Sequence, residues 1–430
     1  MQTINIEQIC KKVTSGGTPL TTRSEFYTSG TIPWIKTKEV NYRRIYDAEN
    51  KITELGLQNS SAKLIPENSI IVAMYGDGKT AGKVAINKVP VATNQACCNL
   101  IIDEEKADYR YVYYYLSKSY EALVNLKSGS GQQNLSATLI KNFPIILPPL
   151  KQQHRISDVL EALDDKIELN RKMNETLEQM ARAIFKSWFI DFDPVHAKRQ
   201  GKKPFAMDDN TAALFPDSFE QSELGDLPTE WQVANLSTGC DSIFSGGTPS
   251  TQNTAFWGGE LPWLSSGETR ESIIVSTEKY ITQAGVDGSS TRMARAGSVV
   301  VAGAGQGHTR GQTSLLSFDS FINQSVLGLS ANNNLISDFW LFTNLSRRYE
   351  QFRQLSDSHS SRGSLTTKLV AGIRMVFPPK PVIAAFDKIA EPTYQAIINN
   401  LKENQTLAET RDLLLPRLLS GELIVKELNS

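Results

Sequence analysis

The sequence SGGTP, at residues 15–19, occurs a second time at residues 245–249. Four further landmarks follow each copy in the same order: Pro33-Trp34 and Pro262-Trp263, GDGKTAG at 76–82 and GQGHTRG at 305–311, Asn94-Gln95 and Asn323-Gln324, and Pro148-Pro149 and Pro378-Pro379. The register between the copies changes by only one residue, and a period this long lets each copy bury a core of its own. The sequence therefore predicts a duplicated domain, arranged as a pseudo-twofold, that does one kind of thing on two targets.

The composition is typical of a soluble globular protein with room for two domains. The chain has 430 residues, of which 40% are hydrophobic and 21% charged. No apolar run approaches the ~20 residues needed to cross a membrane, and the start MQTINIEQIC lacks the features of a secretory signal. The four cysteines form no C-x-x-C pair and indicate a reducing cytoplasm without a metal site. Cys10 and Cys240 occupy equivalent repeat positions, which favours small buried core residues over reactive thiols.

The net charge of −1 hides an uneven distribution. Residues 1–150 carry 17 Lys and Arg against 13 Asp and Glu, and residues 231–380 carry 12 against 10. The segment 151–230 is acidic, with 11 basic residues against 16 acidic ones. Because phosphate attraction acts over roughly 8–10 Å, the local sign decides whether a domain attracts nucleic acid. Both repeated domains are therefore compatible with a nucleic-acid partner.

Each copy is predicted to mix strands and helices, which gives the α+β class. The β-branched runs SIIVAM at 69–74 and SVVVAG at 298–303 read as buried strands. The segments 109–126 and 338–355 read as helices, and each copy ends in an apolar strand before its Pro-Pro pair. The shared G-x-G-x-T-x-G pattern is expected to form a tight loop where the backbone approaches its own core or a DNA backbone.

After each Pro-Pro pair the periodicity becomes helical. Residues 152–189 contain neither Gly nor Pro, and apolar positions alternate at spacings of four and three, which is typical of a coiled-coil seam. At ~1.5 Å per residue this helix is roughly 55–60 Å long. A second seam runs over residues 386–418, where Pro392 and Pro416 are expected to kink the helix or trim its ends. The two helices are expected to pair with each other in antiparallel fashion.

Four asparagines lie near the middle of the two seams. They are Asn170, Asn174, Asn400 and Asn404. Either they are exposed on a slightly rotated helix, or they face each other at the crossing point and fix the register of the pair at some cost in stability. The polar stretch 193–230 belongs to neither copy and is interpreted as a linker that leads to the second domain.

The sequence contains no convincing catalytic motif. The stretch AMYGDGKT at 73–80 approaches a nucleotide-binding P-loop, but the following AGKVAIN reads as a strand where a P-loop needs a helix. The second copy places His308 where the P-loop lysine would stand. The remaining candidates are basic and amide side chains of the kinds that read base edges and phosphates, although each is individually more often a solvated surface group. These candidate DNA-binding residues are Lys36, Lys38, Arg43, Arg44, Lys79, Lys83, Gln132 and Gln133 in the first copy, and Arg270, Arg292, Arg295, His308, Arg310 and Arg362 in the second.

The ordered set of motifs resembles the specificity subunits of type I restriction–modification systems. The resemblance rests on the duplicated SGGTP, P-W, G-x-G-x-T-x-G and N-Q landmarks, on PPLKQQHRI before the first helix and FDPVHAK after it, and on ELGDLPTEW and the terminal LLPRLLSGEL. It covers essentially the whole chain. One departure is that the first copy has no counterpart of the LPTEW lead, which leaves its first strand in question.

The resemblance implies a non-catalytic subunit that reads a bipartite, asymmetric target in double-stranded DNA. It implies target recognition domains at 1–150 and 231–380, spacer helices at 151–192 and 381–425, and the linker at 193–230 between them. The implied partners are two methyltransferase subunits and the restriction (motor–nuclease) subunits, with S-adenosylmethionine, ATP and Mg bound on those partners. The alternatives are a fused or ATP-dependent DNA-modifying enzyme, and a coiled-coil scaffold without sequence-specific DNA binding.

Overall fold

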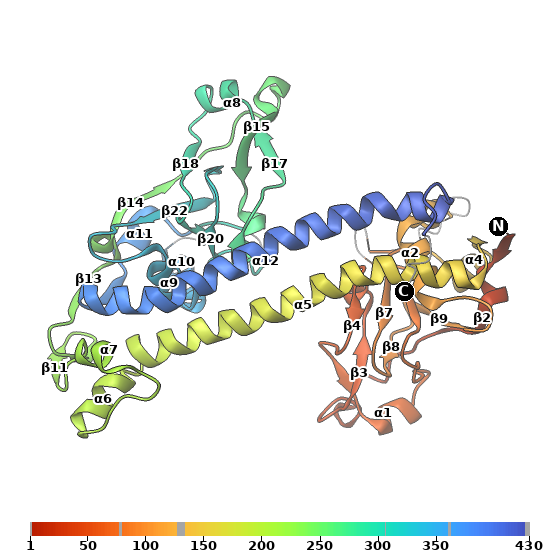
Figure 1. Cartoon of the computed structure of the whole chain (residues 1–430), viewed down its shortest axis with the longest axis horizontal. Helices are drawn as coiled ribbons and strands as arrows, with labels where there is room; N and C mark the ends of the chain where they lie inside the picture. The colour runs from red at the N-terminus through yellow and green to blue at the C-terminus, as the bar shows by residue number, and fades with distance from the viewer. Residues whose placement is uncertain (1, 77–79, 127–133, 306, 360–362, 426–430) are drawn as a thin grey trace. The chain divides into compact units, whose positions relative to one another are not determined.

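The computed structural model describes residues 2–76, 80–126, 134–305, 307–359 and 363–425 (Figure 1). The chain divides into two compact units, one formed by residues 1–167 with 406–430 and the other by residues 168–405. Each unit therefore joins one repeat copy to segments of both long helices. None of the described helices is long and apolar enough to cross a membrane.

The first unit is built on a five-stranded sheet. In spatial order its strands are β2 (Cys10–Ser15), β9 (Cys97–Ile102), β6 (Ile70–Ala73), β7 (Val84–Asn87) and β4 (Arg44–Ile45). A three-stranded sheet lies beside it, with the order β5 (Lys51–Ile52), β3 (Ile32–Ile35) and β8 (Ala92–Thr93). Strand β1 (Gln2–Asn5) pairs antiparallel with β10 (Pro144–Leu147), so the first strand forms although the sequence left it in question.

The second unit repeats the five-stranded sheet strand for strand and adds one strand, β18, to the neighbouring sheet. Its five-stranded sheet has the order β14 (Cys240–Ser245), β22 (Val326–Ala331), β19 (Val299–Ala302), β20 (Thr313–Leu316) and β16 (Ile273–Ile274). The neighbouring sheet has the order β17 (Lys279–Ile281), β15 (Trp257–Leu264), β21 (Ser320–Ile322) and β18 (Arg292–Ala294), and β13 (Gln232–Asn235) pairs with β23 (Arg374–Phe377). Strands β4 and β7 are parallel, as are their counterparts β16 and β20. The predicted duplicated α+β fold is confirmed.

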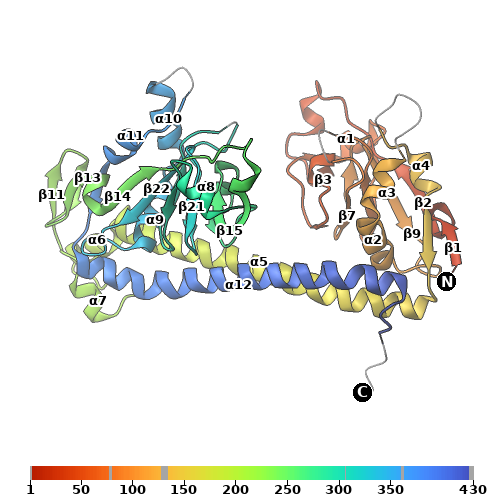
Figure 2. The same ribbon diagram turned by 90° about the horizontal axis from the view of Figure 1, so that it is seen from above.

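Short helices cover the sheets in matched positions. The first unit has α1 (Glu54–Gln58), α2 (Tyr109–Lys118), α3 (Tyr120–Asn125), α4 (Ala137–Lys141), and the 3₁₀ turns η1 (Ile6–Ile9), η2 (Ser24–Phe26) and η3 (Thr37–Glu39). The second has α8 (Gln283–Asp287), α9 (Asp338–Ser346), α10 (Tyr349–His359), α11 (Thr367–Ala371), and the turns η4 (Leu236–Gly239), η5 (Thr254–Phe256) and η6 (Ser266–Arg270). Figure 2 shows α2 and α9 each lying along the sheet of its own unit.

The helices predicted at 109–126 and 338–355 are each broken in two. In the first copy the break is at Ser119, whose backbone (φ −86°, ψ 16°) ends α2 and begins α3. The side chain of Ser119 hydrogen-bonds the carbonyl of Tyr115. A serine that bonds the preceding turn competes with regular helix geometry, which accounts for the break.

The glycines of SGGTP are required by close backbone approach between the two sheets. A Cβ on Gly16 would come within 2.1 Å of the carbonyl oxygen of Thr93, at the end of β8. A Cβ on the equivalent Gly246 would come within 1.8 Å of the carbonyl oxygen of Ile322 in β21. Because no side chain fits there, the repeated SGG is a scaffold feature that joins the edge of one sheet to the next.

The paired tryptophans serve the same junction. The indole Nε1 of Trp34 donates to the carbonyl of Gly17 at 3.0 Å, and Nε1 of Trp263 donates to that of Gly247 at 3.2 Å. Both rings are buried. The SGGTP and Pro-Trp landmarks of the repeat therefore stabilise the fold.

The two long helices are α5 (Leu150–Phe189) and α12 (Lys380–Ser420). The sequence predicted that Pro392 and Pro416 kink the helix or trim its ends; α12 continues through both prolines, so the prediction that they end it is wrong. Each proline removes one helical hydrogen bond, at a cost of about 3 kcal/mol. Buried neighbours such as Tyr394 and Leu418 offset that cost by packing against the domains.

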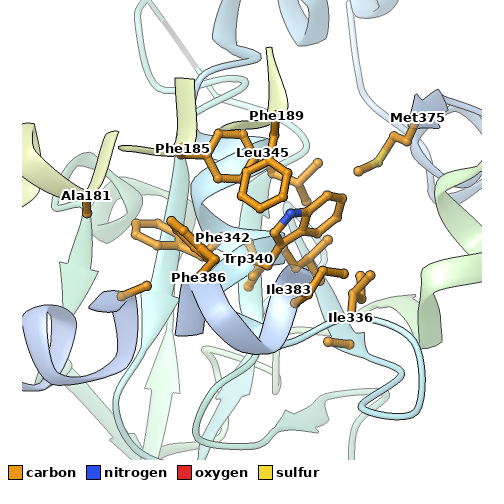
Figure 3. Close-up of a cluster of buried hydrophobic side chains, with 14 of the residues drawn as sticks. Ala181, Phe185, Phe189, Ile336, Trp340, Phe342, Leu345, Met375, Ile383 and Phe386 are labelled. Atoms are coloured by element: carbon orange, nitrogen blue, oxygen red, sulfur yellow. The ribbon is translucent and has the colours of Figure 1, made fainter. Parts of the chain in front are cut away.

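In the second unit, the helices hold the domain through an aromatic cluster (Figure 3). Phe185 and Phe189 of α5 lie 5.6 and 5.4 Å, centroid to centroid, from the ring of Phe386 in α12. Phe189 also meets the fully buried Trp340 of α9 edge-on at 6.0 Å. Such pairs contribute about 0.5–1.5 kcal/mol each beyond their area burial.

In the first unit, ion pairs add to the apolar core that Leu160 of α5 and Leu418 of α12 share with the domain. Arg44 of β4 forms ion pairs with Glu161 (3.4 Å) and Asp165 on α5. Arg110 of α2 forms ion pairs with Asp158 (2.8 Å) and also with Glu161 (2.6 Å). Asp164 accepts hydrogen bonds from the Tyr114 hydroxyl at 2.7 Å and from Arg411 of α12 at 2.8 Å. Both copies thus pack apolar side chains on the long helices, and the first copy adds this set of ion pairs.

The central asparagines meet between the helices of the second unit. Asn170 Nδ2 donates to Asn404 Oδ1 at 2.9 Å and to Glu403 Oε2 at 2.8 Å, and Asn400 Nδ2 donates to Asn174 Oδ1 at 2.8 Å. The partner's number falls as the number on α5 rises, so these helix segments run antiparallel.

The stretch 193–230, interpreted from sequence as a linker, is folded. It contains α6 (Asp193–Arg199), α7 (Asp209–Ala213) and the hairpin of β11 (Phe219–Ser222) and β12 (Gly225–Pro228). Val195 and Phe215 are fully or almost fully buried in the aromatic core of the second unit, beside Trp231. The stretch is thus an integral part of that unit.

Candidate nucleic-acid interface

Three chain segments meet at one edge of the first unit. The backbone N–H of Leu135 donates to the carbonyl of Met74 at 2.9 Å, which joins the chain after α3 to the end of β6. A Cβ on Gly76 would lie 3.4 Å from Oγ1 of Thr37, so η3 lies against the start of the glycine-rich segment. We call this region the glycine-loop edge; in the first unit it comprises residues 36–43, 74–83 and 134–135 as far as the structure describes them.

The second unit forms the same edge. Leu365 N–H donates to the carbonyl of Gly303 at 2.8 Å, and Arg270 of η6 donates to Oγ1 of Thr309 at 3.3 Å. Here the glycine-loop edge comprises residues 265–272, 303–312 and 363–365, again within the described residues. The recurrence shows that the repeat builds one platform twice.

The glycine-rich segments require a left-handed backbone at matched positions. Gly82 has φ +91° and Gly311 has φ +88°. The chain after each of them enters a strand, β7 or β20, and no helix follows. A P-loop needs a helix N-terminus at that place to hold phosphate, so this segment is not a nucleotide site.

Three predicted basic residues lie at the first glycine-loop edge. Lys36 places its ammonium 5.1 Å from the centroid of the Trp34 ring, Lys38 forms an exposed ion pair with Glu49 at 2.5 Å, and Arg43 is exposed. Exposed pairs of this kind contribute at most about 1 kcal/mol, so Lys38 is easily released to another anion.

Lys83 lies at the same edge beside a residue that the sequence did not single out. Its ammonium donates to Oδ1 of Asn41 at 2.8 Å and lies 5.9 Å from the ring centroid of Tyr42. Tyr42 has a left-handed backbone, φ +51°, which is uncommon for a bulky side chain. No local sequence pattern signals this conformation.

Two predicted residues of the second copy lie at the glycine-loop edge with exposed side chains, namely Arg270 and His308. Arg310 is only 11% exposed, because it forms an ion pair with Asp357 of α10 and donates to the carbonyl of Gly363. It therefore ties the chain on either side of the edge together, as a structural residue.

Three other candidates lie elsewhere. Arg44 is 13% exposed and engaged with the acidic side chains of α5. Arg292 lies in β18 with its guanidinium 4.3 Å from the ring centroid of Phe244. Arg295 precedes β19 whereas the glycine-rich segment follows it, so the two lie at opposite ends of that strand. Lys79, Gln132, Gln133 and Arg362 lie outside the described residues.

A glutamate, buried in the first copy and half-buried in the second, organises each edge, and the sequence analysis missed it. Glu39 accepts the backbone N–H groups of Lys36 and Glu49, both at 3.1 Å. In the second copy Glu268 does the same for Ser265 at 2.8 Å and Glu278 at 2.9 Å. The signal was present, because both glutamates fall at the same repeat position.

The described residues contain no group of three or more His, Cys, Asp or Glu side chains that could hold a metal ion. Cys10 and Cys240 are partly buried, and burial raises the pKa of each thiol to about 12. These thiols are therefore protonated and unreactive at neutral pH.

The chain matches known proteins along nearly its full length. The sequence profile of the type I restriction modification DNA specificity domain matches residues 1–179. The MjaIX specificity subunit of Methanocaldococcus jannaschii is 27% identical over 421 residues, which span 97% of this chain and 92% of the relative. The HindI specificity subunit of Haemophilus influenzae is 28% identical over 365 residues, 75% of this chain and 76% of the relative.

A solved structure shares the fold. The type I restriction–modification S subunit from M. genitalium superposes with a TM-score of 0.58 at 16% identity, covering 99% of this chain and 96% of the other. This likeness shows that the two chains share an overall fold. Along nearly its whole length the chain is similar to the specificity subunits of type I restriction–modification systems.

Proposed function

We propose that this chain reads a bipartite, asymmetric site in double-stranded DNA, each unit reading one half through its glycine-loop edge. The similarity to specificity subunits supports a DNA-recognition role in which the catalytic activities belong to partner subunits. The observation that carries the proposal is the pair of equivalent edges with identical strand order but different side chains. One scaffold with two sets of side chains is what two unlike half-sites require.

The chain would act in the cytoplasm within a larger complex. We expect two methyltransferase subunits and the restriction (motor–nuclease) subunits as partners, with S-adenosylmethionine, ATP and Mg bound by those partners. The same site would then be read once and used for both methylation and restriction.

Domain exchange tests this proposal. Residues 231–380 are replaced by the same region of a relative, the full chain is co-expressed with its methyltransferase subunits, and the methylated sequences are mapped in genomic DNA. We expect one half of the target to change and the other to stay. A change in both halves would show that the two units do not read separately.

A second test addresses the basic residues of the first edge. Lys36→Gln with Lys38→Gln should weaken DNA binding and reduce the slope of log K against log salt by about one for each phosphate that these lysines neutralise. The matched control changes Lys11 and Lys12, which are exposed on β2 at the opposite side of the sheet. If both double variants gave the same slope of log K against log salt, Lys36 and Lys38 would not contact phosphates in the complex.

A further inference from the structure

Two positions of the glycine-loop edge carry contrasting chemistry on matched strands, although the backbone at the first position is left-handed in one copy (Tyr42, φ +51°) and extended in the other (Glu271, φ −83°). The first is Tyr42 in one copy and Glu271 in the other, each two residues before the short parallel strand β4 or β16. The frame is matched by hydrogen bonds: Ile86 N–H donates to the carbonyl of Arg43 at 3.1 Å, and Leu315 N–H to that of Ser272 at 3.0 Å.

The second position is Lys83 in one copy and Gln312 in the other, immediately before β7 and β20. Both follow the left-handed glycine of the loop, Gly82 or Gly311. Strands β7 and β20 pair with β4 and β16, so in each unit the two positions are neighbours across the edge. Each unit therefore presents one pair of side chains from two adjacent strand entries.

In the first unit the pair is a phenol and a cation. Tyr42 has a left-handed backbone whose N–H donates to the carbonyl of Val84 at 2.8 Å, and the residue is 36% exposed. Its ring meets that of Tyr120 edge-on at 6.4 Å. Its hydroxyl makes no hydrogen bond to any residue that the structure describes, and burial raises its pKa to about 12, so it stays a donor at neutral pH.

In the second unit the pair is an acid and an amide. Glu271 is exposed and forms no ion pair with the described part of the chain. Gln312 is half-buried, and its Nε2 donates to the carbonyl of His308 at 3.2 Å, which leaves its Oε1 as an acceptor. Both side chains line one cavity of about 310 Å³, and Tyr42 lines a cavity of about 760 Å³ in the first unit.

We propose that Tyr42 with Lys83, and Glu271 with Gln312, are specificity-determining pairs, each reading bases within its own half-site. The inference rests on the proposed function and adds the residues and base chemistry to it. A lysine donates to O6 and N7 of guanine, and a phenol adds a donor or acceptor beside it. A glutamate accepts from N4 of cytosine, and a glutamine pairs with adenine. The first half-site should thus contain a guanine contact, and the second a cytosine or adenine contact.

The test exchanges the pairs between the copies. One variant carries Tyr42→Glu and Lys83→Gln, and the other carries Glu271→Tyr and Gln312→Lys. Each full chain, assembled with its methyltransferase subunits, methylates a DNA library randomised at the target, and the modified molecules are sequenced. We expect each variant to change base preference by roughly tenfold or more at positions of one half-site, leaving the other half-site as in the wild type.

Conservative variants keep the result independent of folding. Tyr42→Asn suits the left-handed backbone, and Glu271→Gln is isosteric, so each removes the reading group with little effect on the frame. Thermal unfolding checks that both are folded. Unchanged base preference in the folded variants would overturn the proposal for these pairs. A wild-type complex without any sequence preference would instead overturn the proposed function itself.

Discussion

Arg411 offers the sharpest test of how the first unit is held to its helices. Its guanidinium donates to Oδ1 of Asp164 at 2.8 Å, while the other carboxylate oxygen accepts from Tyr114. The two charged side chains are 26% and 16% exposed. Arg411→Met removes the cation and leaves the carboxylate with its phenol partner in a partly buried site.

The expected cost lies between two limits. Fully exposed ion pairs contribute about 0–1 kcal/mol, and removing one partner of a fully buried pair costs about 3–5 kcal/mol. At this partial burial, with one hydrogen bond kept, we expect about 1–3 kcal/mol. The control is Asp412→Ala, because Asp412 also pairs with Arg411 at 2.8 Å but is 65% exposed. That change should cost less than about 1 kcal/mol.

Hydrogen exchange measured by mass spectrometry on the full chain separates the two units. In the Arg411→Met variant, slowly exchanging amides of α2 and of residues 150–167 should exchange roughly 5- to 150-fold faster, since about 1.4 kcal/mol is a factor of ten. Amides of α9 should keep their rates. Equal exchange rates in the Arg411 and Asp412 variants, or a uniform change in both units, would show that the Arg411–Asp164 ion pair does not hold the first domain to its helices.

Three further changes have defined outcomes. Gly246→Ala should lower the free energy of unfolding, measured in urea, by more than about 3 kcal/mol, because its Cβ would meet a backbone oxygen at 1.8 Å. The control is Gly267→Ala, whose Cβ would have its nearest neighbour at 3.8 Å, and it should change this free energy by no more than about 0.5 kcal/mol. Burial raises the pKa of Asp338 to about 6, so the stability contributed by its protonated form is present at low pH and lost as the pH rises through 6. Asp338→Asn, which stays neutral, should therefore raise the unfolding temperature above that of the wild type at pH 7.5. This advantage should shrink as the pH falls below about 6 and be gone by about pH 4. An advantage independent of pH would contradict this cause. Asn170→Ala leaves the amide oxygen of Asn404 without its donor between the two helices, and it should lower the free energy of unfolding in urea by about 1–3 kcal/mol. No change in this free energy would show that water takes the place of the donor.

The architecture was predictable because its landmarks are steric necessities. Glycines that must admit a neighbouring backbone, such as Gly16 and Gly246, recur wherever the fold recurs, and they leave a visible repeat. The unbroken seam of residues 152–189 likewise predicted α5 closely. The two prolines of α12 led to a wrong prediction, because helix propensity depends on the local sequence, whereas the tertiary packing that overrides it involves residues distant in the sequence.

The candidate interface was only partly predictable. A basic residue shows its charge in the sequence but not its partner, so Arg44 and Arg310, which are engaged within the fold, looked the same as Lys36. Tyr42 was missed for the converse reason, because its prominence comes from a backbone conformation that no neighbouring residue announces. Comparing the two copies position by position recovers such residues, since it separates shared frame from changed side chain.

The ion pairs between the first domain and α5 limit where recombination can join this domain to another gene without separating charged partners. The acids that receive Arg44 and Arg110 lie at Glu161 and Asp165, beyond the strand that closes the domain. A gene fragment ending at codon 150 would move these arginines into a new host protein without their partners on α5, and only Arg110 would keep a counter-ion, Asp108. Recombination that creates new specificities should therefore cross over inside the first helix, after codon 165, and donors and recipients should match in those turns.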